Sequence, residues 1–290
     1  MPMRKRWLRI TLISVALLLA FGLFWTFGRR PVRQPVSEAW FQGVTYERIV
    51  WETPRPVLFH LVTIDLTAPG IGFVTTAPDP SGGLDLRAQT VLNFARDYEA
   101  QIAINASYFS PFHSRTPFDY YPHAGDPVDA HGLAIADGII YSDDGLAGDT
   151  LCINGIQLSI QTTGCPPDTQ IGLSSFPLLL QAGTPEPLDN EALGPRTAVA
   201  LDAAGTTLWL LTVDGRQPRY SEGVTLAELA AFLAERGAAD ALNFDGGGST
   251  TLVAQTNGRY QASNAPIHTR IPMRLRPVAN HLGVFAAPLP

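Results

Sequence analysis

An aspartate followed by three consecutive glycines has the residue types that a catalytic loop needs. Glycines in a row weaken a strand, so Gly246, Gly247 and Gly248 indicate left-handed backbone or a close approach to a ligand. Their free amides would form an anion-binding nest, to which the hydroxyl of Ser249 could contribute. Asp245 beside such a nest could serve as general acid, general base or nucleophile. A tight turn that begins with a hydrogen-bonding aspartate is the alternative interpretation.

Two arginines stand at the expected ends of strands. Arg196 precedes one strand, and Arg216 follows another, with Asp214 two residues before it. An arginine can hold a phosphate or a carboxylate through two parallel hydrogen bonds, so these positions predict an anion site. Because Lys5 is the only lysine in the chain, such a site must rely on arginines and backbone amides. For Asp214 and Gly215, a type I′ turn is the alternative.

A loop rich in histidine and aspartate is a further candidate. It contains His113, Asp119, His123, Asp126, Asp129 and His131. The spacing matches no zinc motif, because no two of these histidines are three or four residues apart on a helix. Surface or hydrogen-bonded histidines are the favoured interpretation, with a divalent metal or a catalytic imidazole as the alternative. No cofactor is predicted, and the chain has no Walker A or dinucleotide fingerprint.

The elements that must position these side chains are mainly strands. β-branched or alternating apolar runs predict strands over 57–66, 72–76, 101–108, 132–141, 197–201, 207–213, 241–244, 250–254 and 281–286. The clearest helix spans 226–236, where Thr225 and Glu228 form a capping box and Gly237 is a stop signal. A second helix is expected over 86–98. The fold class is therefore α+β, with a mixed β-sheet, few helices and long loops.

The order of elements repeats along the chain. Residues 65–105 and 202–243 each hold the end of a strand, a turn, a second strand, a helix and a strand that ends in asparagine. Two ββαβ-like units of one length would pair about a pseudo-twofold axis, with Asn105 and Asn243 facing a shared cleft. A coincidence of ordinary hairpins is the alternative. The irregular stretches between the units are expected to form site loops.

The charges of the two ends of the chain differ. Residues 1–40 carry seven of the twenty basic side chains and one acid, so the other 250 residues carry 13 basic against 25 acidic groups, or −12. A nucleic-acid binder needs a basic face that displaces counterions from phosphates, and this chain is not expected to be one. A small phosphodiester, by contrast, needs only two or three converging arginines.

The N-terminal segment has the pattern of a membrane signal. Residues 10–27 form an uncharged stretch of 18 residues with basic residues on both sides, long enough to cross a bilayer as a helix. We expect residues 1–40 to be a short cytoplasmic tail, an uncleaved signal anchor and a linker, and residues 41–290 to be an exported domain. That domain would be periplasmic or on the cell surface; secretion after signal cleavage is the alternative.

Two cysteines agree with an exported domain. Cys152 and Cys165 are 13 residues apart and flank two glycines, a spacing that suits a disulfide across a hairpin or loop. Two unrelated buried thiols are the alternative.

Several motifs, in their order, resemble the phosphodiester glycosidase family. They are Ile104-Asn-Ala-Ser-Tyr-Phe109, Gly194-Pro-Arg-Thr197, Asp214-Gly-Arg216, Ser221-Glu-Gly223, Asn243-Phe-Asp-Gly-Gly-Gly-Ser249 and Arg276-Pro-Val-Ala-Asn280. The resemblance runs from about residue 55 to 287. It implies hydrolysis of a sugar-1-phosphodiester with release of the sugar, and polar residues of these motifs lining the cleft. The family often has Asn-Gly-Gly-Phe-Phe where this chain has Asn105-Ala-Ser-Tyr-Phe109.

A mechanism follows as a hypothesis from these residues. Arg196, Arg216 and Arg276 would hold the phosphodiester, and Asp214 and Asp245 would divide the acid, base or nucleophile work at the anomeric carbon. The expected substrate-binding residues are Asn105, Arg196, Arg216, Asn243, Gly246, Gly247, Gly248, Ser249, Arg276 and Asn280. The partners would be a small phosphoglycan or glycan and, through the N-terminal helix, the membrane. A non-catalytic, membrane-tethered glycan-binding module and a metal-dependent phosphodiesterase are the alternatives.

Overall fold

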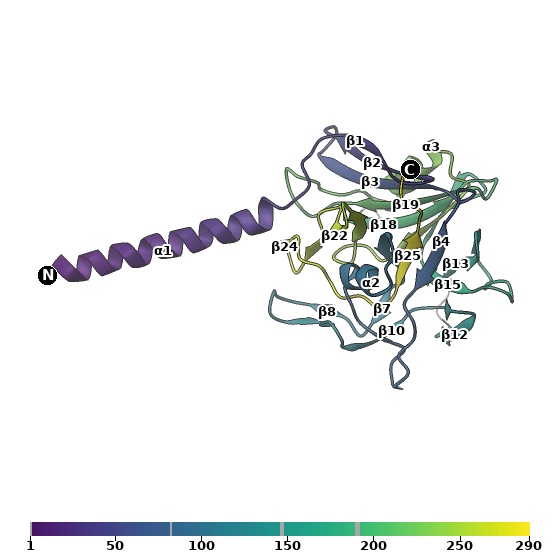
Figure 1. Cartoon of the computed structure of the whole chain (residues 1–290), viewed down its shortest axis with the longest axis horizontal. Helices are drawn as coiled ribbons and strands as arrows, with labels where there is room; N and C mark the ends of the chain where they lie inside the picture. The colour runs from purple at the N-terminus through teal and green to yellow at the C-terminus, as the bar shows by residue number, and fades with distance from the viewer. Residues whose placement is uncertain (1, 82, 146–147, 189–191) are drawn as a thin grey trace.

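The N-terminal helix stands apart from a β-rich body. The computed structural model describes residues 2–81, 83–145, 148–188 and 192–290; in helix α1 (Pro2–Phe27) the side chains at 2–6, 8–10, 19, 23, 25 and 26 lie outside the description. Figure 1 shows α1 extending away from the body. Within the described part of the chain, no helix is both long enough and apolar enough to cross a membrane, so the predicted transmembrane helix is not supported.

The largest sheet has eight strands in the order β1-β2-β3-β19-β18-β20-β16-β17. Their bounds are β1 Val36–Phe41, β2 Val44–Trp51, β3 Val57–Asp65, β16 Leu178–Gln181, β17 Thr184–Pro185, β18 Arg196–Leu201, β19 Thr207–Val213 and β20 Asp240–Phe244. β1 and β2 form a hairpin that the sequence patterns did not predict. The predicted boundary between residues 40 and 41 falls within β1.

A second sheet of five strands packs against the first. Its order is β22-β21-β6-β25-β4, with β22 Arg259–Ala262, β21 Leu252–Thr256, β6 Ile102–Asn105, β25 His281–Phe285 and β4 Gly72–Thr75. Buried side chains of both sheets share one apolar cluster, which joins Leu210 and Leu242 of the first sheet to Ile104 and Leu282 of the second. Burial of this cluster is the main favourable contribution to folding.

Helices cover the outer faces of the two sheets. Helix α3 (Leu226–Glu235) packs Leu229 and Leu233 against the eight-stranded sheet, and helix α2 (Val91–Asp97) packs Phe94 against the five-stranded sheet. The predicted capping box of Thr225 and Glu228 is present. The body is thus layered helix, sheet, sheet, helix (Figure 1), and the predicted α+β class is confirmed.

The remaining strands form smaller sheets beside these layers. One sheet has the order β12-β11-β15-β13-β14, and the others join β5-β10-β7, β8-β9 and β23-β24. Their bounds are β5 Leu86–Arg87, β7 Phe109–Ser110, β8 His113–Ser114, β9 Tyr120–Tyr121, β10 Pro127–Ala130, β11 Ala134–Ala136, β12 Ile139–Ser142, β13 Asp149–Asn154, β14 Gln157–Gln161, β15 Ile171–Ser175, β23 Ile267–His268 and β24 Ile271–Pro272. Cys152 in β13 and Cys165 after β14 form the predicted disulfide, with their Cα atoms 5.6 Å apart.

Two expectations about the sheets are wrong. Every pairing between the described named strands is antiparallel, so the sheet is not mixed. The two ββαβ-like units do not form equivalent structures, because β3 joins the large sheet, while β4 and β6 flank β25 in the other sheet. In the second unit, by contrast, β18 pairs with both β19 and β20.

Two predicted elements are shorter than expected. The helix predicted over 86–98 begins only at Val91, because Leu86–Arg87 pair with β10 and Thr90 caps the helix by accepting a hydrogen bond from the Asn93 amide. The strand predicted over 132–141 is divided into β11 and β12 by a turn at Asp137 and Gly138, both of which have positive φ.

Candidate active site

The loop that carries Asp245 is fixed where β6 and β20 end. The Asp245 amide donates to the carbonyl of Ala106 at 2.9 Å, and the side-chain amide of Asn105 donates to the Asp245 carbonyl at 2.6 Å. The Asn105 oxygen accepts from the Thr197 hydroxyl and the Thr251 amide. The two strand ends therefore meet as predicted. The Asn105 side chain, however, is buried, and its amide and oxygen are bonded to other residues of the protein, so it positions the Asp245 loop.

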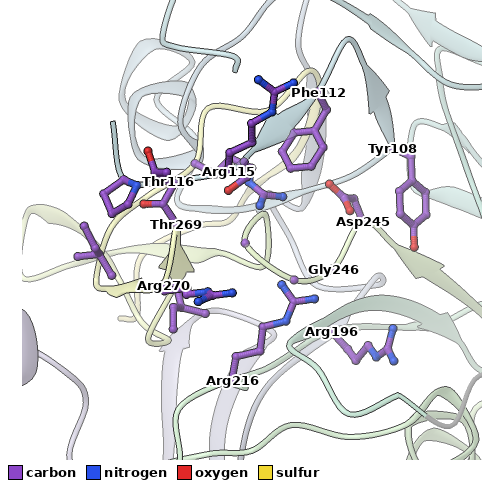
Figure 2. A pocket seen from close by; sticks show the side chains of 17 residues that line it. Tyr108, Phe112, Arg115, Thr116, Arg196, Arg216, Asp245, Gly246, Thr269 and Arg270 are labelled. Atoms are coloured by element: carbon purple, nitrogen blue, oxygen red, sulfur yellow. The ribbon is translucent and has the colours of Figure 1, made fainter. Parts of the chain in front are cut away.

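A pocket of about 1060 Å³ opens beside this loop (Figure 2). Its walls combine many cations with one described carboxylate, that of Asp245. It is lined by Tyr108, Phe112, Ser114, Arg115, Thr116, Pro117, Arg196, Arg216, Asp245, Gly246, Gly247, Gly248, Ile267, Thr269, Arg270, Ile271 and Arg276. Five arginines thus surround one acid, in a chain whose net charge is −6. Such a pocket favours an anionic ligand.

Each glycine of the triplet leaves room for a particular neighbour. A Cβ on Gly246 would lie 2.8 Å from the Pro195 carbonyl oxygen, and one on Gly248 would lie 2.3 Å from Nη2 of Arg276. Gly247 has φ of +60°, and its Cβ would lie 2.9 Å from Nη1 of Arg216. The three glycines predicted that another group would lie close to the backbone. At Gly247 and Gly248, that group is an arginine side chain of the protein itself.

The predicted nest of free amides is not formed as expected. The Gly247 amide donates to the Pro195 carbonyl at 2.9 Å, and the Ser249 amide donates to the Gly246 carbonyl at 3.1 Å. Both amides are thus used within the loop. The guanidinium groups of the pocket, and not these two amides, are therefore available to an anion.

Asp245 has the electrostatic surroundings of a titrating catalytic group. The Ser249 hydroxyl donates to Asp245 Oδ2 at 2.5 Å and itself accepts from Nη1 of Arg276 at 3.1 Å. Burial raises the pKa of Asp245 to about 6, although Arg276, the Ser249 hydrogen bond and Arg216 oppose the rise. A carboxyl with this pKa gains or loses its proton close to neutral pH, as an acid or a base in catalysis must. Ser249 is fully buried and does not line the pocket; its hydroxyl links Arg276 to Asp245 through two hydrogen bonds.

Arg276 is held rigidly by an imidazole and an aromatic ring. Its Nε donates to Nδ1 of His268 at 3.2 Å, and its Cζ lies 4.5 Å from the ring centre of Phe112. Burial, and then the nearby arginines, lower the pKa of His268 to about 3, so the ring is neutral and carries its proton on Nε2. His268 was not predicted, because no local pattern marks it.

Arg196 and Arg216 both line the pocket, but only the Arg196 side chain is fixed by hydrogen bonds to described residues. Arg196 is half-buried, and its guanidinium donates to the carbonyls of Ala192 and Val224 at 2.6 and 3.2 Å. Arg216 is exposed and has φ of +56°; its amide donates to the Glu222 carbonyl at 3.3 Å, whereas its guanidinium makes no hydrogen bond or ion pair with the described residues. Left-handed backbone at a residue other than glycine stores strain and tends to occur at functional sites. Arg216 is thus poised to bind an anion.

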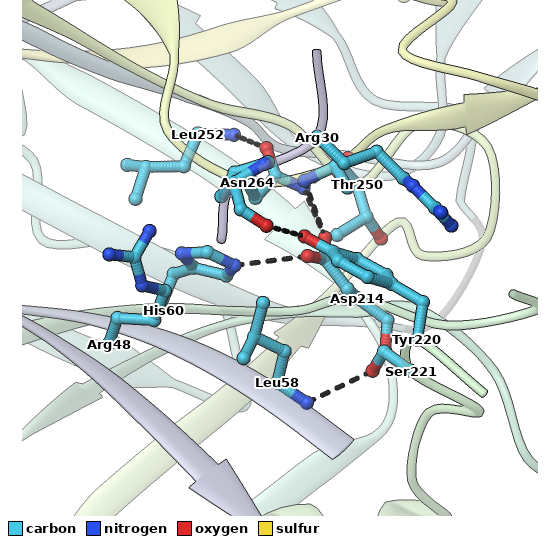
Figure 3. Close-up of polar contacts among 12 residues, drawn as sticks. Arg30, Arg48, Leu58, His60, Asp214, Tyr220, Ser221, Thr250, Leu252 and Asn264 are labelled. Carbon is cyan, nitrogen blue, oxygen red and sulfur yellow. Dashed lines mark hydrogen bonds and ion pairs between the residues drawn. The ribbon is translucent and has the colours of Figure 1, made fainter. Parts of the chain in front are cut away.

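Asp214 lies outside this pocket, in a buried polar cluster (Figure 3). Its Oδ1 accepts from the Asn264 side chain at 3.1 Å and from the Ala265 amide at 2.8 Å, and its Oδ2 lies 3.0 Å from Nε2 of His60. The Tyr46 hydroxyl lies 2.8 Å from the other ring nitrogen of His60. Asp214 is fully buried, and its two carboxylate oxygens are occupied by these partners, so its catalytic role stays a prediction to which the pocket lends no support.

The other two asparagines of the motifs are also supports. The Asn243 side chain donates to the Tyr108 hydroxyl at 3.1 Å and to the Phe176 carbonyl at 2.8 Å. The Asn280 oxygen accepts from the Ser107 amide at 2.8 Å. Neither asparagine lines the pocket, and both position the segment that presents Tyr108; their substrate contacts stay predictions.

The histidine-rich loop makes local pairs. His113 lies 3.1 Å from Asp119 and His123 lies 3.3 Å from Asp126, in exposed or half-exposed positions. Across the described residues, no group of three histidine, cysteine or acidic side chains could hold a metal ion. The favoured interpretation of hydrogen-bonded surface histidines agrees with these pairs.

Comparisons with known proteins bear on the family and the fold. The family model for phosphodiester glycosidases matches residues 98–285. The fold is similar to that of a hypothetical protein from Synechocystis, with a TM-score of 0.66, 18% identity, and coverage of 88% of this chain and 64% of that one. No curated protein matches the sequence.

Two further solved structures share the fold. The catalytic domain of zebrafish N-acetylglucosamine-1-phosphodiester α-N-acetylglucosaminidase, auto-inhibited by its pro-peptide, has a TM-score of 0.58 and 20% identity over 90% of this chain and 92% of that one. A putative exported protein from Burkholderia pseudomallei has a TM-score of 0.55 and 16% identity, over 79% and 74% of the two chains.

Proposed function

The chain belongs to the phosphodiester glycosidase family and is a hydrolase, and from this premise we propose that it cleaves an N-acetylglucosamine-1-phosphodiester in the cell envelope, releasing the sugar. The observation that carries the proposal is the placement of Asp245. It is the one described carboxylate in a pocket lined by five arginines. That arrangement suits a substrate that is anionic next to the bond that breaks.

The arginines would bind and neutralise the phosphodiester. Arg276 and Arg216 both lie against the glycine loop, and both act on the charge of Asp245. Their guanidinium groups would hold the phosphoryl oxygens and stabilise the charge that develops on the departing phosphomonoester. A phosphate leaving group is already a weak base, so it needs charge neutralisation more than protonation.

Asp245 would act as the general base at the anomeric carbon. In its ionised form it would take a proton from a water molecule whose oxygen bonds to that carbon. The bond between the anomeric carbon and the bridging oxygen breaks, and its electron pair leaves with the phosphomonoester. Since Asp214 is outside the pocket, the hypothesis of two carboxylates that share this work is replaced by one carboxylate assisted by arginines.

Aromatic side chains would hold the sugar. Tyr108 and Phe112 line the same pocket, and Phe112 is 45% exposed although one side of its ring faces Arg276. Exposed aromatic rings are well suited to packing against the apolar face of a sugar ring. The sugar would thus lie between these rings and Asp245.

The disulfide supports an envelope setting for the enzyme. Disulfides form and persist in oxidising compartments outside the cytoplasm, and Cys152 and Cys165 are bonded to each other. Thiol labelling of fractionated cells tests this part of the proposal. Blocked thiols in the periplasmic or surface fraction are expected, whereas free thiols in a cytoplasmic fraction would contradict it.

Hydrolysis in ¹⁸O-labelled water tests the proposed reaction. The substrate is the methyl phosphodiester of N-acetylglucosamine-1-phosphate, and the label in the products is located by mass spectrometry. We expect the label in the sugar. Label in the phosphate would show attack at phosphorus and would refute the glycosidase chemistry, and failure of the folded protein to release sugar would refute the proposed substrate.

A further inference from the structure

The pocket has a second side that the proposed reaction does not use. Figure 2 shows Arg115, Thr116, Thr269 and Arg270 on one side of the pocket and Asp245 on the other. These four residues come from the β8-β9 hairpin and from the turn between β23 and β24. We name this set the outer wall.

The outer wall is held in place by Arg274. Its Nη1 donates to the carbonyl of Pro117 at 2.9 Å and to the hydroxyl of Thr269 at 2.8 Å, so it ties the hairpin to the turn. Its Cζ also lies 4.6 Å from the ring centre of Tyr120, on the same hairpin. A charged side chain that bridges two loops in this way makes their relative position part of the folded structure.

The backbone of the turn is strained where it presents a cation. Thr269 has φ of +51° and Arg270 has φ of +64°. Left-handed backbone at two successive residues that are not glycine costs energy and persists where surrounding contacts require it. Arg270 makes no hydrogen bond or ion pair with the described residues, whereas Arg115 has an exposed partner, Asp119, at 3.6 Å. Arg270 is thus the stronger anion ligand of the two.

The charges in the pocket exceed what one phosphodiester needs. A phosphodiester carries one negative charge, and Arg216 and Arg276 beside the glycine loop can match it. Of the three arginines that remain, Arg196 donates to the carbonyls of Ala192 and Val224, and Arg115 and Arg270 lie on the opposite side from Asp245. Arg115 shares its charge with Asp119, whereas Arg270 has no ion-pair partner among the described residues, so an anionic group on a ligand would supply its counter-charge.

We propose that the preferred substrate carries a second phosphate on its leaving group, bound by Arg270 and Arg115 of the outer wall. This inference rests on the proposed function, because the first phosphate must lie at Arg216 and Arg276. The sugar and scissile bond would then lie beside Asp245, and the phosphorylated leaving group would extend toward the outer wall. Substrates of this class are sugar-1-phosphodiesters of an already phosphorylated alcohol or glycan.

Binding of two synthetic esters tests the second phosphate site. The probes are the methyl and the 3-phosphopropyl esters of N-acetylglucosamine-1-phosphate, titrated calorimetrically into the full chain with Asp245→Asn, which prevents turnover. We expect the 3-phosphopropyl ester to bind at least tenfold more tightly at low salt. In the same background, Arg115→Ala/Arg270→Ala should reduce this preference to below about threefold. Equal affinity for the two esters, or a preference that survives this double variant, would overturn the inference.

A charge-matched variant and a turnover assay separate the possible failures. Arg96→Ala/Arg259→Ala removes two exposed arginines outside the pocket and should leave the preference intact; a collapse here too would attribute the preference to net charge and overturn the inference. Turnover of both esters by the wild-type chain tests the proposed function separately. A tenfold binding preference without sugar release would refute the proposed function alone, and sugar release from both esters without a preference would refute the second phosphate site alone.

Discussion

Asp245 and Asp214 occupy equivalent places in the sequence pattern and opposite places in the molecule. Each directly follows a strand, precedes a glycine, and lies next to the strand that begins with Arg196, because β18 pairs with both β19 and β20. Asp245 faces a pocket lined by arginines, and its pKa is raised to about 6. Asp214 faces His60, Asn264 and Ala265, and no solvent. One strand end thus places its carboxylate at the pocket, and the neighbouring strand end buries its carboxylate among hydrogen bonds that hold loops together.

The contrast between Asp245 and Asp214 shows that the role of a carboxylate at a strand end depends on the residues that face it from other parts of the chain. Ser221 illustrates the structural side, because its hydroxyl donates to the Asp214 carbonyl at 2.5 Å and accepts from the Leu58 amide at 3.0 Å (Figure 3). Around Asp245, the opposite element supplies Arg276 and leaves a cavity. A buried carboxylate with several donors stabilises the structure, and one at a cavity edge can exchange protons.

Removal of the Arg276 guanidinium should produce the largest loss on the pocket side. Arg276→Ala removes a ligand for the phosphodiester and the donor to Ser249, and should lower kcat/KM about 10³-fold. Steady-state kinetics with the methyl ester measure this. Arg259→Ala, an exposed arginine on β22, is the control and should change kcat/KM less than twofold. A loss below tenfold for Arg276→Ala would exclude Arg276 as a main phosphate ligand.

Gly248→Ala should mimic part of that loss without removing any charge. The added Cβ would lie 2.3 Å from Nη2 of Arg276, which must move. We expect kcat/KM to fall about 10²-fold, because a small misplacement of a positioning group can cost that much. If kcat/KM stayed within threefold in a folded variant, the close packing of Gly248 against Arg276 would not be needed for activity.

Gly247→Ala should have a smaller effect, and the chain offers a matched control. Gly247 and Gly258 both have positive φ, +60° and +70°, so an alanine at either costs about 1 kcal/mol of backbone strain. Only at Gly247 would the Cβ also meet Arg216, at 2.9 Å. We expect kcat/KM to fall about tenfold for Gly247→Ala and less than twofold for Gly258→Ala. Equal kinetics for the two variants would show that Arg216 needs no room at this position.

The pH dependence of activity should follow Asp245. Since the base must be ionised and its pKa is about 6, kcat/KM should rise about tenfold between pH 5 and pH 7. The contribution of Asp245 to the free energy of unfolding should change with pH in the opposite direction to kcat/KM. Its pKa is higher in the folded than in the unfolded chain, so the folded state holds more protons between pH 4 and pH 6, and this contribution to the free energy of unfolding falls as the pH rises through that range. A kcat/KM that falls from pH 5 to pH 7 would make Asp245 an acid instead.

Local patterns in the sequence predicted much of the fold. The capping box at Thr225, the disulfide between Cys152 and Cys165 and most core strands depend on residues close together in the chain, and they are confirmed. The expected symmetry of two units failed, because β25 from the C-terminal end enters between β4 and β6. Strand order in a sheet depends on such distant partners, which spacing alone does not specify.

The same dependence on distant partners decides which predicted site residues lie at the pocket. Asp245, the glycines, Arg196, Arg216 and Arg276 were predicted from their types and do line the pocket. Asp214 does not line it, and the partners that bury it, His60 and Asn264, are 154 and 50 residues away in the chain. Arg270 and His268 were missed because a turn and a buried imidazole carry no local signal. Burial and opposite partners, which decide these roles, exist only in the folded chain.

A direct comparison of Asp245→Asn with Asp214→Asn tests the central claim. The measurement is kcat/KM for the methyl ester, normalised to the folded fraction by circular dichroism and denaturation. We predict a loss of about 10³-fold for Asp245→Asn and below tenfold for Asp214→Asn, which should instead lower the free energy of unfolding by about 2–4 kcal/mol. Equal losses of kcat/KM in the two folded variants, or a larger loss for Asp214→Asn, would contradict the assignment of catalysis to Asp245 and of structure to Asp214.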